Sequence, residues 1–208
     1  MARINMGVFS APRGSIANIT FSRWKRTNYA KQKIQKNTSN TPSQQKVRSA
    51  FAIATALVKP LYPILKQGFS LYTDRMSAYN AAVQYTIKNS LTPENEIDYS
   101  KVLISCGGSL SPAVNTSAYS DERSIVFEWD TNESSSAYAT DKSLVALINP
   151  TNNEVVFNDA GVERSTGIQT IRVSPLWSGQ KVHAYIGFVS EDKKNVATST
   201  YLGEITIA

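Results

Sequence analysis

The sequence predicts an α+β protein, in which a basic N-terminal region of strands and helices precedes an antiparallel β-sandwich of the fibronectin or immunoglobulin type. Three observations predict this. Residues 41–93 carry apolar residues at helical spacing, whereas residues 94–208 hold seven short β-branched runs separated by turn residues. Charge also divides the chain: residues 1–90 hold fourteen Lys/Arg and one acid, and residues 91–208 hold eight Lys/Arg and fifteen acids. We expect a basic arm or hairpin over residues 1–40, then the helical region and the sandwich.

Length and composition exclude several classes of site. A chain of 208 residues is long enough to bury a sizeable core. One Cys excludes an internal disulfide and a Cys-rich metal site, and one His excludes the usual multi-histidine metal centres. No run approaches the ~18 apolar residues of a membrane span, and the N-terminus lacks the pattern of a secretory signal. We expect no cofactor, no metal and no membrane insertion.

The first region carries a strand pattern. Apolar and polar residues alternate in part over residues 16–24, as in a half-buried strand. Residues 26–29 favour a turn into a second strand that runs through Lys31 to Ile34. The polar residues 36–40 are typical of a linker.

Aromatic and basic side chains are interleaved along these strands, and two interpretations stay open. The pattern suits stacking on bases combined with neutralisation of phosphates. It suits equally a strand whose aromatic residues pack inward while its charges face solvent. The residues expected to contact a partner subunit or nucleic acid are Arg13, Arg23, Trp24, Lys25, Arg26, Lys31, Lys33 and Lys36.

The helical region begins at Thr41, a suitable N-cap, followed by Pro42 at the first helical position. Pro60 ends this helix because proline cannot continue one. Residues 61–65 make at most a short turn or helix before Gly68, and a further helix is expected over about residues 75–89. The predicted buried stripe of the first helix comprises Val47, Ala50, Phe51, Ala54, Leu57 and Val58.

The remaining residues match an antiparallel sandwich. The expected strands are residues 101–106, 124–129, 143–149, 154–158, 168–174, 182–189 and 196–207. Trp129 follows two alternating apolar residues and is expected in the core. A single Cys forbids the disulfide of antibody domains, so a fibronectin-type sandwich is the nearer comparison.

No catalytic motif is present. Neither the phosphate-binding loop nor the dinucleotide fingerprint occurs. A Cys106–His183 nucleophilic pair is conceivable, but a structural role for both residues is the favoured interpretation. Glu128 and Asp130 flank Trp129 without the spacing of a metal loop or a glycosidase pair. We expect that the protein is not an enzyme.

The sequence resembles an uncharacterised protein family widespread in Bacteroidota and their phages. The residues that carry the resemblance are Gly14, Ser15, Ile16, Phe21, Arg23, Trp24, Lys25, residues 40–43, Gln45, Arg48, Phe51, Leu57, Pro60, Leu61, Leu65, Gly68, Phe69, residues 77–83, 98–105 and 108–110, Gly179, and residues 182–185, 188–190 and 199–203. They span nearly the whole chain. The resemblance implies a non-catalytic structural module of a virion or another large assembly, with no site residues to transfer.

The charge division and the resemblance favour a structural protein. We expect a phage virion component, such as a minor capsid, decoration or tail protein, assembled in the bacterial cytoplasm. Its partners would be copies of itself and other structural subunits, met through the basic N-terminal region. The alternative is a cytoplasmic protein that binds nucleic-acid phosphates without sequence specificity. A third hypothesis, an enzyme or a carbohydrate-binding sandwich, rests only on the versatility of the fold.

Overall fold

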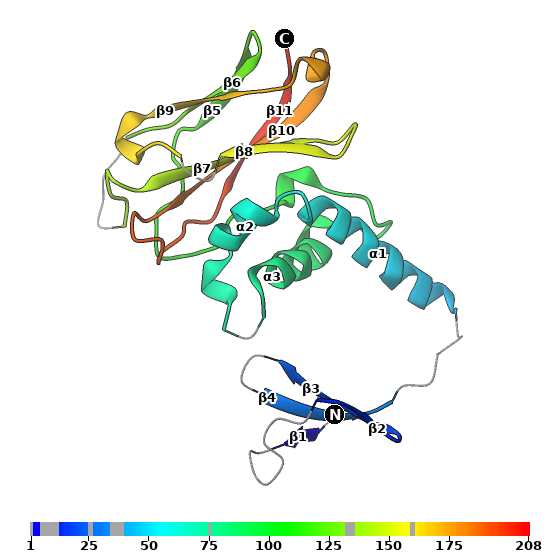
Figure 1. The fold of residues 1–208 in the computed structure, drawn as a ribbon. Helices are drawn as coiled ribbons and strands as arrows, with labels where there is room; N and C mark the ends of the chain where they lie inside the picture. Colours follow the sequence, from blue (N-terminus) through cyan, green and yellow to red (C-terminus); the bar gives the residue numbers. More distant parts are fainter. Residues whose placement is uncertain are drawn as a thin grey trace. The chain divides into compact units, whose positions relative to one another are not determined.

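The computed structural model describes two compact units, Met1–Pro42 and Ser43–Ala208, which are treated separately below. The described residues are 2–4, 13–24, 27–33, 40–74, 76–131, 136–158 and 161–208. Figure 1 shows the elements of each unit.

The N-terminal unit contains one antiparallel sheet of four strands in the order β1-β4-β3-β2. The strands are β1 (Ala2–Ile4), β2 (Gly14–Ile16), β3 (Ile19–Trp24) and β4 (Thr27–Gln32). The predicted strand and its return strand are found as β3 and β4, with corrected bounds. Residues 17–18 form a turn before β3, and β4 already begins at Thr27, within the predicted turn, and ends at Gln32. Ile34 lies outside the described residues. The short outer strands β1 and β2 were not expected, because three residues are too few to show an alternation.

Helices form at all three predicted places. The short element expected over residues 61–65 is a helix that extends to Gly68, and the third helix starts later than predicted. The helices are α1 (Pro42–Val58), α2 (Tyr62–Gly68) and α3 (Ala78–Tyr85), and α3 continues into a π-helical turn, η2 (Thr86–Ser90). The third helix begins later than residue 75 because the Ser77 side chain caps it, accepting a hydrogen bond of 3.2 Å from the Asn80 backbone N–H.

Two antiparallel sheets follow, in the orders β11-β10-β7-β8 and β5-β6-β9. Their strands are β5 (Ser117–Asp121), β6 (Ser124–Glu128), β7 (Lys142–Asn149), β8 (Glu154–Asn158), β9 (Ile168–Arg172), β10 (Lys181–Val189) and β11 (Thr200–Thr206). The expectation of helices with antiparallel sheets is therefore confirmed, and six of the seven predicted runs contain a strand. β5 was missed because its apolar residues are only Ala118 and Tyr119.

The strand predicted over residues 101–106 is wrong. Lys101, the first residue of this run, belongs to a 3₁₀ turn, η3 (Tyr99–Lys101). The residues that follow it form hydrogen bonds outside the β-sheets. The Ile104 N–H donates to the Ser199 hydroxyl at 3.0 Å, and the Cys106 N–H donates to the Gly68 carbonyl at 2.9 Å. This segment therefore ties the end of α2 to the chain just before β11.

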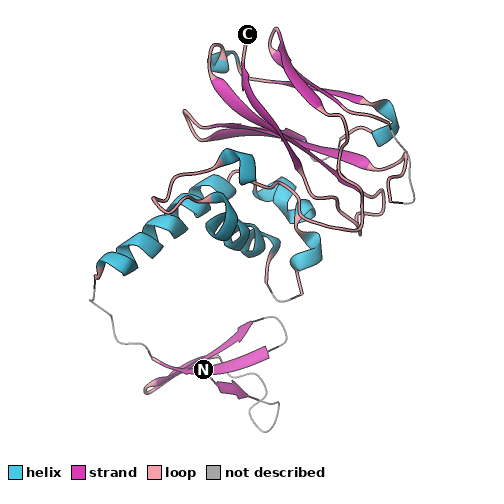
Figure 2. Ribbon diagram, turned by 180° about the vertical axis from the view of Figure 1, so that it is seen from behind, coloured by secondary structure: helices cyan, strands magenta, loops and turns pink. Residues whose placement is uncertain are grey.

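The larger unit has three layers (Figures 1 and 2). The sheet containing β7 and β10 lies in the middle, with the smaller sheet on one side and the helices on the other. One core joins the two sheets through Ile125, Phe127, Val145, Leu147, Ile186 and Phe188, with Trp129 buried in it as predicted. A second core joins the middle sheet to the helices through Leu57, Ile64, Leu65, Leu144, Ile148 and Tyr185. Strands covered on both faces need apolar residues at successive positions, which explains the nearly continuous apolar runs of β7 and β10.

A buried ion pair stabilises the rim of the two-sheet core. Arg164 and Asp141 are each 1% exposed, and Nε of Arg164 lies 3.4 Å from Oδ2 of Asp141. The guanidinium donates to the Ser111 carbonyl at 2.8 Å, and its central carbon lies 3.7 Å from the ring centroid of Phe188. Burial lowers the pKa of Arg164, and the Asp141 carboxylate opposes that shift. The Arg164 backbone carbonyl accepts a hydrogen bond of 2.8 Å from the Trp129 indole N–H, so the polar atom of this core side chain is satisfied.

Candidate functional site

The N-terminal sheet has one face rich in apolar residues, here called the apolar face. The strand register places on it Gly14, Ile16, Ile19, Phe21, Arg23, Asn28, Ala30 and Gln32. Ile16 is 70% exposed and Ile19 is 47% exposed. Within the described part of this unit, no helix or second sheet covers them. A sheet with an apolar face is stable when another layer covers it, so this face is a candidate interface.

The opposite face, here called the aromatic face, carries a different chemistry. The register places on it Ser15, Thr20, Ser22, Trp24, Thr27, Tyr29 and Lys31. Trp24 is 51% exposed, and it lies diagonally across the β3–β4 pair from Tyr29. An exposed tryptophan near a half-buried tyrosine and a lysine suits stacking on unpaired bases.

The structure does not gather the predicted contact residues on one face. Arg23 lies on the apolar face and Lys31 on the aromatic face, while the exposed Arg13 and Lys33 lie just outside β2 and β4. The strand alternation divides the interleaved pattern in this way, because neighbours along a strand point to opposite sides. Lys25, Arg26 and Lys36 lie outside the described residues.

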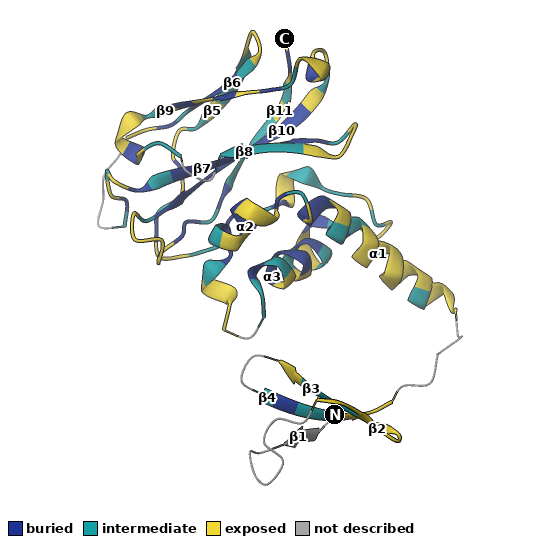
Figure 3. Cartoon of the chain, in the orientation of Figure 1, coloured by how far each residue is buried: buried dark blue, intermediate teal, exposed yellow. Residues whose placement is uncertain are grey.

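Helix α1 exposes a second apolar surface. Val47 is 69% exposed and Phe51 is 56% exposed, whereas Ala54 and Leu57 of the same stripe are buried (Figure 3). The predicted buried stripe is thus confirmed for the second half of the helix and wrong for the first half. The reason is length: the core with α2 covers only the last turns of α1. A hollow of about 410 Å³ lies beside Phe51, against Val83 and Ile87 of the third helix.

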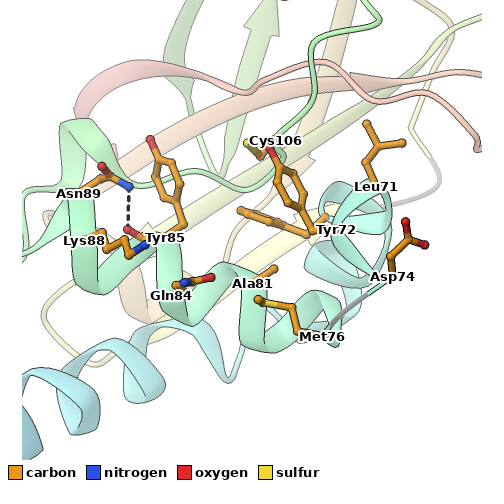
Figure 4. A pocket seen from close by; sticks show the side chains of 11 residues that line it. Leu71, Tyr72, Asp74, Met76, Ala81, Gln84, Tyr85, Lys88, Asn89 and Cys106 are labelled. Atoms are coloured by element: carbon orange, nitrogen blue, oxygen red, sulfur yellow. Dashed lines mark hydrogen bonds between the residues drawn. The ribbon is translucent and has the colours of Figure 1, made fainter. Parts of the chain in front are cut away.

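A separate pocket of about 450 Å³ lies beside α3 (Figure 4). Its lining residues are Phe69, Leu71, Tyr72, Asp74, Met76, Ala81, Gln84, Tyr85, Lys88, Asn89 and Cys106. The Tyr72 hydroxyl lies 3.2 Å from the Cys106 sulfur, and this hydrogen bond raises the pKa of Tyr72. Burial raises the pKa of Tyr85. Both phenols therefore stay neutral near pH 7 and can donate hydrogen bonds.

Cys106 and His183 have separate partners. Cys106 contacts Tyr72, whereas Nδ1 of His183 lies 2.9 Å from the Tyr201 hydroxyl and its ring stacks on Tyr99 at 4.0 Å. Burial lowers the pKa of His183, and Glu204 opposes that shift. The conceivable nucleophilic pair has no hydrogen bond to support it.

The carboxylates near Trp129 serve the fold. Glu128 accepts a hydrogen bond of 3.0 Å from the Tyr119 hydroxyl, and Asp130 accepts one of 2.6 Å from the Asn115 amide. Among the residues that the structure describes, no three His, Cys, Asp or Glu side chains gather as metal ligands. None of the helices in the described ranges has the length and apolar character that crossing a bilayer requires.

Comparisons with known proteins give a family match and distant likenesses to solved structures. The model of a family described as "Family of unknown function (DUF6266)" matches residues 11–203. No curated protein matches the chain. A fibronectin type III domain of the human collagen alpha-1(XX) chain is similar at 11% identity and a TM-score of 0.35, over 50% of this chain and 92% of that one. A TM-score of 0.35 is too low to support an inference about this chain.

Proposed function

Since the chain belongs to this family of unknown function, DUF6266, we propose its function from its own surfaces: it is a non-enzymatic structural subunit of a large assembly. The N-terminal unit makes the contacts to neighbouring subunits. The observation that carries the proposal is the apolar face of the N-terminal sheet, where Ile16 and Ile19 are exposed within a unit that contains no acid.

Packing energetics support this role. A single antiparallel sheet can bury its apolar side chains only if a second layer packs against it. In this unit that layer would have to come from another molecule or another part of the assembly. The exposed Val47 and Phe51 of α1 offer a further apolar surface in the other unit. Two such surfaces on one chain suit a subunit that meets more than one neighbour.

Charge supports contact between copies. Residues 1–42 hold eight Lys/Arg and no Asp or Glu, whereas residues 91–208 hold eight Lys/Arg and fifteen acids. Opposite charge on two parts of one chain favours a heterologous contact, in which the basic part of one copy meets the acidic part of the next. The proposal extends to a phage virion of Bacteroidota hosts as the assembly, assembled in the bacterial cytoplasm, and to a fibronectin-like type for the sandwich.

Sedimentation velocity and negative-stain imaging of the full chain test the proposal. At low salt we expect oligomers, which dissociate when salt screens the charges. The double variant Ile16→Ser/Ile19→Ser should stay monomeric while remaining folded by circular dichroism. Leu176→Ser removes an 80% exposed apolar side chain from the other unit and is the matched control, which should assemble normally. A wild-type chain that is monomeric at every concentration and salt would refute the proposal.

A second candidate function, binding of single-stranded nucleic acid, is favoured by the aromatic face. Trp24 and Tyr29 offer stacking surfaces and Lys31 offers a phosphate contact. Fluorescence anisotropy with a thymidine oligonucleotide tests it, since log affinity should fall linearly with log salt. Trp24→Ala should lose about 1–3 kcal/mol of binding, whereas Ile16→Ser/Ile19→Ser should bind normally. Absence of binding at low salt would remove this candidate.

A further inference from the structure

The pocket beside α3 belongs to neither of these surfaces. We propose that it binds a small planar aromatic molecule that carries a negatively charged group. One face of α3 and its π-helical turn forms one wall, through Ala81, Gln84, Tyr85, Lys88 and Asn89, which recur at helical spacing. The 3₁₀ turn η1 (Ser70–Tyr72), the residues that flank it and the Cys106 side chain complete it.

The size and walls of the pocket fit an aromatic body. Its volume of about 450 Å³ lies within the ~300–1,000 Å³ of small-molecule sites. Phe69 lies at ring-centroid distances of 6.0 Å from Tyr72 and 6.5 Å from Tyr85, so three rings surround one space. Such walls favour a flat ring, which can pack against them in stacked or edge-on geometry.

The charges at the two ends of the pocket orient the molecule. Figure 4 shows Lys88 at one end, near Gln84, and Asp74 at the other. Within the described part of the chain, Lys88 has no carboxylate partner. Lys88 and the Gln84 amide can both donate hydrogen bonds, as can the neutral Tyr85 phenol, whereas Asp74 is the sole carboxylate of the lining.

The wider charge of the helices selects an anion over a cation. Residues 43–90 hold six Lys/Arg and one acid, which is Asp74 itself. The field over this surface is therefore positive, and it raises the local concentration of anions. A sulfonate or carboxylate at the Lys88 end gains an ion pair and hydrogen bonds, and it lies away from Asp74.

Titration of the full chain with 1-anilinonaphthalene-8-sulfonate, a fluorescent aromatic anion, tests the proposal. Lys88→Gln should weaken binding about fivefold. Lys66→Gln makes the same charge change on α2, outside the pocket lining, and should bind as the wild type does. Asp74→Asn should bind as tightly as the wild type or more tightly.

Because this dye also binds exposed apolar surfaces, a second readout must report on the pocket itself. Bound dye should slow the alkylation of Cys106 by iodoacetamide, since this thiol is the only one in the chain and lines the pocket. Val47→Ser/Phe51→Ser removes the exposed surface of α1 and should leave that protection intact.

Three results would overturn the proposal. They are equal affinities for Lys88→Gln and Lys66→Gln, an unchanged alkylation rate of Cys106 at saturating dye, and tighter binding by Lys88→Gln with weaker binding by Asp74→Asn. The last result would show that the charges of the pocket do not favour an anion at the Lys88 end. All variants carry exposed substitutions, and their oligomeric state reports separately on the assembly proposal.

Discussion

The two units of this protein differ in how their strands are covered. In the larger unit, β7 and β10 lie between a second sheet and a layer of helices, and nearly all of their residues are buried. In the N-terminal unit, Asn28 is the only buried residue among those whose exposure is described. The larger unit therefore contains its own core, whereas the smaller one leaves apolar residues such as Ile16 and Ile19 exposed, and these are the residues we propose to meet a partner.

The two units also differ in how their charged side chains are paired. All five ion pairs between described residues lie in the larger unit, and one of them is buried. Residues 1–42 contain no acid, so their eight cations have no carboxylate partner within their own segment. The larger unit balances part of its charge through its own ion pairs, whereas the positive charge of the smaller unit suits binding to an external anion or acidic surface.

The largest predicted effect tests the internal stability of the larger unit. Arg164→Ala should lower its free energy of unfolding by about 3–5 kcal/mol, because the buried Asp141 carboxylate loses its cation. Urea denaturation followed by tryptophan fluorescence measures the loss. Arg172→Ala, at an exposed position of β9, is the control and should change stability by less than about 0.5 kcal/mol. Equal losses for both variants would show that the ion pair does not stabilise the core.

The next largest predicted effect is a difference in the free energy of unfolding between two Ile→Ala variants, one in each unit. Ile186→Ala should cost about 2–5 kcal/mol, since Ile186 is 0% exposed between the two sheets. Ile16→Ala should cost less than about 0.5 kcal/mol, since most of its side chain is already in water. Denaturation curves followed by circular dichroism compare the two variants. A large loss for Ile16→Ala would mean that the apolar face is covered within the monomer.

The sequence predicted most elements of both units, but not how the larger unit is layered. Strand and helix periodicities located α1, α2 and most strands, because those patterns depend on near neighbours. The nearly continuous apolar runs of β7 and β10 are typical of strands covered on both faces, but we had expected ordinary sandwich strands there. We expected two layers of sheet and a separate helical region, since periodicity does not say which element supplies each cover.

The candidate surfaces were harder to predict than the elements. Alternation along β3 and β4 could have assigned Phe21 and Trp24 to opposite faces. The pocket could not have been found, because Tyr72, Lys88 and Cys106 come from three segments that only tertiary packing joins. The exposure of Phe51 could not be predicted from the sequence either. The apolar residues of α1 keep the same helical spacing along the part that packs in the core and the part that extends beyond it.

A smaller predicted effect is the pH dependence of the free energy of unfolding, to which the larger unit contributes through His183. Burial lowers the pKa of His183 in the folded protein, so the unfolded chain binds a proton more readily. The stability contributed by the neutral ring is complete above the ordinary histidine pKa of about 6.5 and falls as pH drops below it, by at most about 1.4 kcal/mol per pH unit. Denaturation between about pH 7.5 and 5.5 measures this slope. His183→Phe should flatten it, and residues 1–42 hold no His, Asp or Glu side chain that would add to the slope.

The smallest predicted effect is the removal of the N-terminal unit itself. Neither hydrophobic core contains a residue from 1–42, so deletion of residues 1–39 should change the melting temperature of the remaining chain by less than about 2 °C. The truncated chain keeps the start of α1, so no helix end is lost. Scanning calorimetry of both chains at equal concentration measures the difference. A chain that keeps its stability while losing its oligomers would separate folding from association. A large drop in melting temperature would mean instead that the two units stabilise one another.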